Sequence, residues 1–171
     1  MFEVKPWEIA LSALFGVVIF VFKTVLPFPY DKFLFAPQPL LLALGSLLMG
    51  IPGATFVSLV SGSLTMLLRS SEAFTIFLFS IIYGVLIDGF FLVFKVKTSK
   101  EVKLYRLLVS LAFSSVIVGV ISYYVAIMLN VMPFHTIIML ATMFSGLVNG
   151  VIAGYLTEYI WRKKLAFFVG S

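Results

Sequence analysis

The fold is decided by residues 73–94, AFTIFLFSIIYGVLIDGFFLVF, an apolar run that holds a single acidic residue, Asp88. A helix that crosses a bilayer needs about 20 mostly apolar residues, and this run has that length. Just before it, Ser71 is suited to cap a helix and Glu72 favours a helix N-terminus. The run therefore predicts a transmembrane helix.

Five further apolar runs flank this segment. Together with 73–94 they predict helices over residues 7–26, 38–51, 53–69, 104–130 and 136–162, within a single transmembrane domain that covers residues 1–171. The run 38–51 reaches only about 21 Å at 1.5 Å per residue, so we expect it to be tilted or shielded by its neighbours. The predicted fold class is an all-α integral membrane protein with six transmembrane helices.

The composition supports the same class. Hydrophobic residues make up 62% of the chain and charged residues 11%, whereas soluble domains are about half apolar and a quarter charged. Cysteine is absent, which excludes disulfides, a thiolate nucleophile and Cys-ligated metals. The first apolar run has no basic leader and no small-residue cleavage site, so we expect no cleaved signal peptide.

The basic residues predict the orientation. With six spans, both termini and nine of the twelve Lys and Arg residues lie on one side. Cytoplasmic loops carry the excess of basic residues, so we expect both termini in the cytoplasm and the chain in the cell membrane. Because these residues fall in short hydrophilic gaps and form no single basic face, we expect no nucleic-acid partner. The nine are Lys5, Lys95, Lys97, Lys100, Lys103, Arg106, Arg162, Lys163 and Lys164; the other three are Lys23, Lys32 and Arg69.

Catalysis has little support in the sequence. His135 is the one histidine, no His/Glu pair has metal-ligand spacing, and no Gly-rich phosphate loop followed by Lys-Ser/Thr is present. We therefore expect a protein that is not an enzyme and that has no metal and no cofactor.

A binding site has more support. Asp88 lies inside a span, where charges are costly and tend to be functional, although it could instead stay wet near a helix end or pair with Lys95. Asn149 lies mid-span and either bonds across helices or lines a pocket. Tyrosine rings and polar side chains in the outer gaps are further candidates, although such residues are also common at any membrane interface. The candidate substrate-binding residues are Tyr83, Asp88, Tyr123, Tyr124, Asn149, Arg69, Glu72 and His135.

Small residues recur at four-residue spacing, as close helix packing in a membrane requires. Examples are Gly146, Gly150 and Gly154 in the last span. Each stripe either packs inside the bundle or meets a partner protein. The candidate partner-docking face lies on the first helix and consists of Ala10, Ala13 and Gly16.

The arrangement of spans resembles the substrate-binding S component of energy-coupling factor (ECF) vitamin transporters, and most of all the type linked to thiamine and its hydroxymethylpyrimidine precursor. Five segments carry the resemblance: Gly50–Ser58 (GIPGATFVS), Gly62, Tyr83–Gly89 (YGVLIDG), Ser114–Ser115 and Ser145–Gly150 (SGLVNG). Ala10, Ala13 and Gly16 stand where the family has an alanine-spaced docking motif, but the spacing of that motif is not met.

The resemblance implies a mechanism and partners. The chain would bind a small-molecule vitamin from outside the cell and then topple in the bilayer against a transmembrane coupling protein, driven by two ATPase subunits. One rival interpretation is a membrane scaffold of a cell-shape or assembly complex, which needs no pocket. Another is an oligomeric channel or exporter, which would need a polar stripe along one whole helix.

Overall fold

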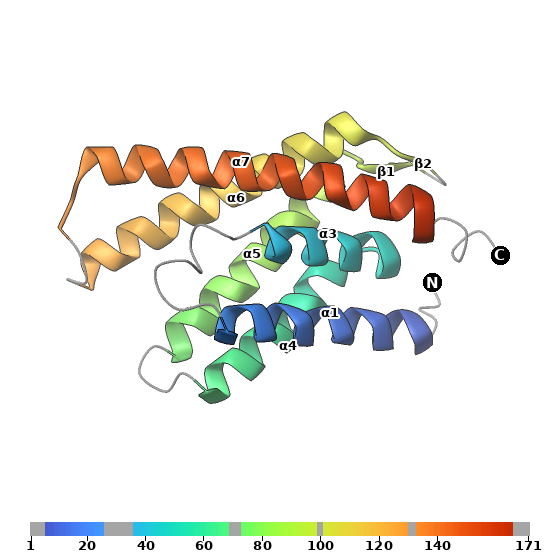
Figure 1. Cartoon of the computed structure of the whole chain (residues 1–171), viewed down its shortest axis with the longest axis horizontal. Helices are drawn as coiled ribbons and strands as arrows, with labels where there is room; N and C mark the ends of the chain where they lie inside the picture. Colours follow the sequence, from blue (N-terminus) through green and yellow to red (C-terminus); the bar gives the residue numbers. More distant parts are fainter. Residues whose placement is uncertain (1–5, 26–35, 69–72, 99–100, 130–132, 166–171) are drawn as a thin grey trace.

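The computed structural model describes residues 6–25, 36–68, 73–98, 101–129 and 133–165. Within these ranges almost all regular structure is α-helical (Figure 1). The six α-helices are α1 (Pro6–Val25), α3 (Pro37–Met49), α4 (Gly53–Leu68), α5 (Ala73–Val93), α6 (Leu104–Met128) and α7 (Thr136–Ile160). Each begins and ends within two residues of the range expected from the sequence, and the predicted all-α class is confirmed.

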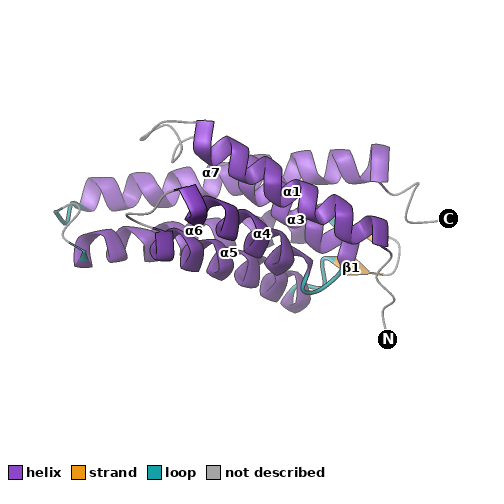
Figure 2. Ribbon diagram, turned by 90° about the horizontal axis from the view of Figure 1, so that it is seen from below, coloured by secondary structure: helices purple, strands orange, loops and turns teal. Residues whose placement is uncertain are grey.

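Two short elements were not expected from the sequence. An antiparallel hairpin of two-residue strands, β1 (Lys97–Thr98) and β2 (Glu101–Val102), connects α5 to α6. A π-helical turn, η1 (Trp161–Leu165), continues α7. Both lie at the end of the bundle where α1 begins and α7 ends, and Figure 2 shows β1 there beside the helices.

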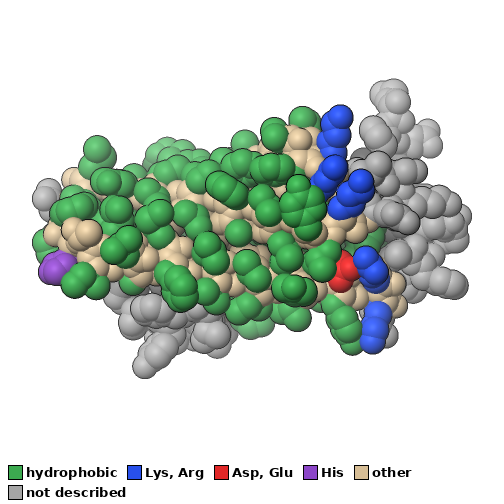
Figure 3. Space-filling model, turned by 90° about the horizontal axis from the view of Figure 1, so that it is seen from above, with side chains coloured by type: hydrophobic (Ala, Val, Ile, Leu, Met, Phe, Trp, Pro, Cys, Tyr) green, Lys and Arg blue, Asp and Glu red, His purple; other side chains and the backbone are tan. Residues whose placement is uncertain are grey.

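Four helices are long and apolar enough to cross a bilayer: Pro6–Thr24, Phe74–Val93, Leu104–Met128 and Thr136–Lys163. The helices α3 and α4 are shorter, at about 20 Å and 24 Å. Apolar side chains cover the molecular surface between the two ends (Figure 3). Soluble monomers rarely expose apolar patches beyond a few hundred Å², so this surface is that of a membrane-embedded protein.

The two ends of the bundle differ in charge. Figure 3 shows Lys and Arg side chains gathered at one end and the histidine at the other. We call the first the basic end; its described basic side chains include Lys103, Arg106, Arg162 and Lys163. Lys23 is the exception among the described basic residues, because it lies in the last turn of α1, toward the opposite end. The opposite end holds the connection from α6 to α7, and we call it the turn end (Figure 1).

The short helix α3 lies at the centre of the bundle. It packs against α1, α4 and α7, and its buried residues are distributed around the whole helix, from Gln38 to Leu48. A helix that is apolar all round is stable only when it is surrounded. The expectation that this short segment is shielded by its neighbours is thus confirmed.

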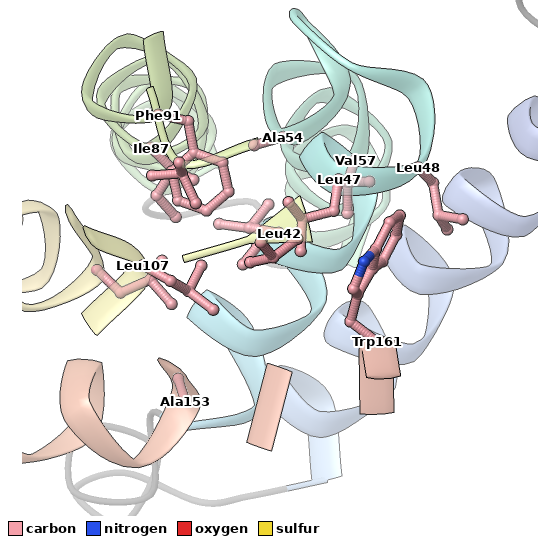
Figure 4. Close-up of a cluster of buried hydrophobic side chains, with 14 of the residues drawn as sticks. Leu42, Leu47, Leu48, Ala54, Val57, Ile87, Phe91, Leu107, Ala153 and Trp161 are labelled. Atoms are coloured by element: carbon pink, nitrogen blue, oxygen red, sulfur yellow. The ribbon is translucent and has the colours of Figure 1, made fainter. Parts of the chain in front are cut away.

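The largest apolar cluster joins α3 to four neighbouring segments. Figure 4 shows Leu42 of α3 among Ile87, Leu107 and Ala153, with Trp161 of η1 at one side. Leu42, Ile87, Leu107 and Ala153 are all fully buried. Four helices and the π-helical turn therefore meet at the level of Leu42.

The glycine stripes serve packing within the bundle. A Cβ added to Gly150 of α7 would lie 2.6 Å from the Cα of Ala112 in α6, and one added to Gly146 would lie 3.0 Å from the carbonyl oxygen of Ser115. These neighbours are backbone atoms, which cannot move aside. The internal-packing interpretation therefore holds for this stripe, because it lets α6 and α7 approach closely.

Gly16, one of the predicted docking residues, also faces inward. It is buried, and an added Cβ would lie 2.7 Å from the Cβ of Val60 in α4. Ala13 is half-buried and Ala10 is exposed. Of the three residues, Gly16 is thus committed to the contact between α1 and α4, and Ala10 is on the outer surface.

Candidate functional site

Asp88 is buried between three helices and caps α4. Its Oδ1 accepts hydrogen bonds from the Ser46 hydroxyl (2.7 Å) and the backbone N–H of Ala54 (3.1 Å). Its Oδ2 accepts from the backbone N–H (2.8 Å) and the hydroxyl (2.7 Å) of Thr55. The N–H groups of Ala54 and Thr55 belong to the first turn of α4, which has no helical acceptor of its own. A negative charge at this position also complements the helix dipole.

These contacts give Asp88 a structural role. An ionised carboxylate offers about four lone-pair positions, and four donors occupy them here. The side chain is only 4% exposed. Asp88 is therefore neither a wet residue at a helix end nor an open acceptor for a ligand, although the sequence suggested both.

Tyr123 holds the turn between α6 and α7. Its hydroxyl donates to the carbonyl oxygen of His135 (2.9 Å) and accepts from the backbone N–H of the same residue (2.7 Å). His135 is the N-cap of α7 and its side chain is exposed at the turn end. The two predicted site residues are thus brought together, but through the backbone of His135 and not through its imidazole.

The remaining predicted residues at this end do not gather around a common point. Tyr124 is 47% exposed on the outer surface, where its hydroxyl approaches the sulfur of Met139. Arg69 and Glu72 lie outside the described residues. Among the predicted residues that the structure describes, Tyr83 and Asn149 are the two whose polar groups face the bundle interior without capping a helix end or a turn.

Tyr83 of α5 and Asn149 of α7 are both buried. The hydroxyl of Tyr83 lies 2.7 Å from that of Ser115 in α6, and one donates to the other. The side-chain nitrogen of Asn149 donates to the hydroxyl of Ser145 one turn earlier in α7 (3.2 Å). Both side chains are at least nine-tenths buried.

A third buried polar side chain belongs to the same level of the bundle. Leu42, Ile87 and Ala153 meet in the apolar cluster (Figure 4), and α3, α5 and α7 all run from the turn end toward the basic end (Figure 1). The residue four positions before each of these three therefore lies one helical turn nearer the turn end, and the three residues reached in this way have a common depth. These residues are Gln38, Tyr83 and Asn149.

Gln38, Tyr83, Ser115 and Asn149 form what we call the polar layer. It lies immediately on the turn-end side of the apolar cluster. Gln38 is 7% exposed, and its Oε1 has no hydrogen-bond partner within the described ranges. A buried acceptor without a donor is costly, so the layer has capacity for a further polar group.

Sequence reasoning missed Gln38. The residue begins an apolar run and stands between two prolines, Pro37 and Pro39, which mark a helix boundary more strongly than a binding residue. A usable signal was present nonetheless. An amide side chain within a hydrophobic segment is expensive in a membrane and is usually kept for a purpose, and Gln38 is the one Gln in the chain.

The described part of the chain offers no metal centre. No three His, Asp or Glu side chains gather there as a metal ion would require. The ion pair between Arg162 and Glu158 and the contact of Lys163 with the ring and hydroxyl of Tyr159 lie at the basic end, on α7 and η1. The four side chains of the polar layer, by contrast, are all uncharged amides or hydroxyls.

Comparison with known proteins adds no relative. No protein-family model, no curated protein and no solved structure matches the chain.

Proposed function

We propose that the chain is the substrate-binding subunit of an ECF-type importer, and that its ligand is a vitamin or a precursor, such as thiamine or its hydroxymethylpyrimidine moiety. The observation that carries the proposal is the polar layer. Buried polar groups in an apolar protein interior are costly unless they are paired. Oε1 of Gln38 has no donor within the described residues, and a ligand that donates to it would supply one.

The proposal includes six spans with both termini in the cytoplasm. Four helices have sufficient length to cross a bilayer, and α3 and α4 lie alongside them. All the described basic side chains except that of Lys23 gather at the end where α5 and α7 finish, which is the end expected to face the cytoplasm. The polar layer is then entered from the outside, through the turn end.

The proposal also includes partners that supply energy. The sequence has no phosphate-binding loop, so ATP would be hydrolysed by two ATPase subunits and the movement transmitted by a transmembrane coupling protein. Such a protein needs a lipid-exposed face with small residues. Ala10 is exposed on α1 and Ala13 is half-buried beside it.

A membrane scaffold is the second candidate function. The observation that favours it is the internal use of Asp88 and Tyr123, whose polar groups hold helices and a turn in place. A scaffold would leave the polar layer empty of any small molecule.

A ligand screen distinguishes the two functions. The purified protein in detergent is mixed with a panel of vitamins and precursors, and binding is read by thermal shift and by native mass spectrometry. An importer subunit binds one member, and Asn149→Ala weakens that binding by roughly 1–3 kcal/mol because buried hydrogen bonds are lost. Ser110→Ala is the control, because Ser110 bonds only to the carbonyl of Arg106 in its own helix. Absence of binding by every compound favours the scaffold.

A further inference from the structure

Gln38 defines what a ligand of the polar layer must provide. Its side chain is more than nine-tenths buried, and Oε1 is an acceptor without a donor within the described ranges. Two serine hydroxyl groups of α6 already have acceptors. Ser110 and Ser114 donate to carbonyls of their own helix, at 2.7 Å and 2.8 Å. A ligand that enters the layer therefore meets an acceptor that requires an N–H or O–H group.

The charges around the layer define a second requirement. Asp88 is the one charged side chain that is fully buried among the described residues, and its oxygens already accept four hydrogen bonds at α4. Within the described residues, a charged ligand at this depth would therefore meet no free buried counter-charge, and an unpaired buried charge is far more costly than a neutral group.

We infer that the ligand of the polar layer is an uncharged heteroaromatic compound that donates a hydrogen bond to Oε1 of Gln38. This inference rests on the proposed function and narrows it. It favours the neutral aminopyrimidine precursor over thiamine, which carries a permanently cationic thiazolium ring. The ring of Tyr83 supplies apolar contact at the same level.

The test compares pairs of compounds that share a ring and differ in charge. Isothermal titration of the full-length protein in detergent uses 4-amino-5-hydroxymethyl-2-methylpyrimidine against thiamine, and nicotinamide against nicotinate. We expect the neutral member of whichever pair binds to have an affinity at least about 100-fold higher, because the charged member is desolvated without a partner.

Variants of Gln38 test the contact itself. Gln38→Leu removes the acceptor with little change of volume and should weaken binding of the neutral compound by about 10- to 100-fold. Without ligand, its melting temperature should equal or exceed that of the wild type, because an unpaired buried acceptor has been removed. If Gln38 served structure alone, Gln38→Leu would instead have a lower melting temperature than the wild type. Gln38→Met serves as a second variant if Gln38→Leu does not fold, and Ser110→Ala should retain full affinity.

The outcomes separate the inference from the proposed function. Equal or tighter binding of the charged member overturns the inference and leaves the importer function standing. Unchanged affinity in both Gln38 variants overturns the assigned contact alone. If none of these compounds, and no other vitamin in the panel, binds the wild-type protein, the importer function fails and the inference fails with it.

Discussion

The backbone N–H of Thr55 in α4 donates a 2.8 Å hydrogen bond to the carboxylate of Asp88 in α5, 33 residues further along the chain. The first turn of α4 is thus capped by a side chain from another helix. Ser46 adds a bond from α3 to the same carboxylate. One acidic group therefore connects three consecutive helices close to the turn between α3 and α4.

Replacement of this carboxylate should destabilise the bundle. Asp88→Asn substitutes an amino group for one acceptor oxygen and leaves at least one buried donor unpaired, at a cost of roughly 2–4 kcal/mol. The free energy of unfolding is measured in mixed micelles with increasing amounts of denaturing detergent. Ser46→Ala should lower it less than Asp88→Asn does, because only one hydrogen bond disappears. If Asp88→Asn keeps wild-type stability but loses ligand binding, Asp88 is a ligand contact after all.

Two glycines offer a matched test of helix packing. Gly150→Ala should destabilise the protein by about 1–3 kcal/mol, because the new methyl group meets the backbone of Ala112. Gly89→Ala adds the same atom where nothing lies within 4 Å. That variant should be neutral or stabilised by up to about 1 kcal/mol, since Ala favours helix over Gly. If Gly150→Ala and Gly89→Ala had the same free energy of unfolding, the result would argue against the close contact of α6 with α7.

Adjacent tyrosines test the turn between α6 and α7. Tyr123→Phe removes both hydrogen bonds to the backbone of His135 and should cost roughly 1–3 kcal/mol. Tyr124→Phe removes a long contact to sulfur on the exposed surface and should leave stability unchanged. The same denaturation assay measures both. Equal stability of Tyr123→Phe and the wild type would show that the hydroxyl does not hold the turn.

The orientation can be read from two single cysteines in the naturally Cys-free chain. Lys103→Cys lies at the basic end and His135→Cys at the turn end, and both positions are exposed. A membrane-impermeant maleimide added to intact cells should label the cysteine at 135, and the one at 103 only after permeabilisation. Labelling with the reverse pattern would place the termini outside.

A bulky residue on α1 tests the docking face. Ala10→Trp should abolish co-purification with a coupling protein and leave ligand affinity intact, because the side chain is exposed. Phe144→Trp, on the exposed face of α7, is the control and should retain the partner. Gly16 is unsuitable for this test, because any larger side chain there meets Val60 within the bundle. If Ala10→Trp still co-purifies with the coupling protein, the docking face lies elsewhere on the surface.

The sequence predicted the helices well because hydrophobic length and proline or glycine breaks are local signals. The run 53–69, for example, became α4 over Gly53–Leu68. The role of Asp88 could not be predicted in the same way. Its partners, Ser46, Ala54 and Thr55, come from segments 33 to 42 residues away, and their donors are partly backbone groups with no signature in the sequence.

The positions of the polar-layer residues could be predicted from the sequence only in part. Tyr83 and Asn149 were recognisable as polar groups within apolar spans, and the structure brings them to one level with Gln38. The sequence could not place Gln38 there, because the depth at which α3 begins depends on how it packs against α7. The β1–β2 hairpin was missed because two-residue strands lie below the length at which alternation of side chains can be recognised.

The central helix α3 has Gln38 near one end and Ser46, bonded to Asp88, near the other. Eight residues of α-helix separate them by about 12 Å. A helix with its backbone hydrogen bonds intact is stiff along its axis, and most of α3 is buried among the other helices. Its two ends therefore move together. If a ligand shifts Gln38 along the helix axis, we therefore expect Ser46 to shift with it and to change its hydrogen bond to Asp88 at the start of α4.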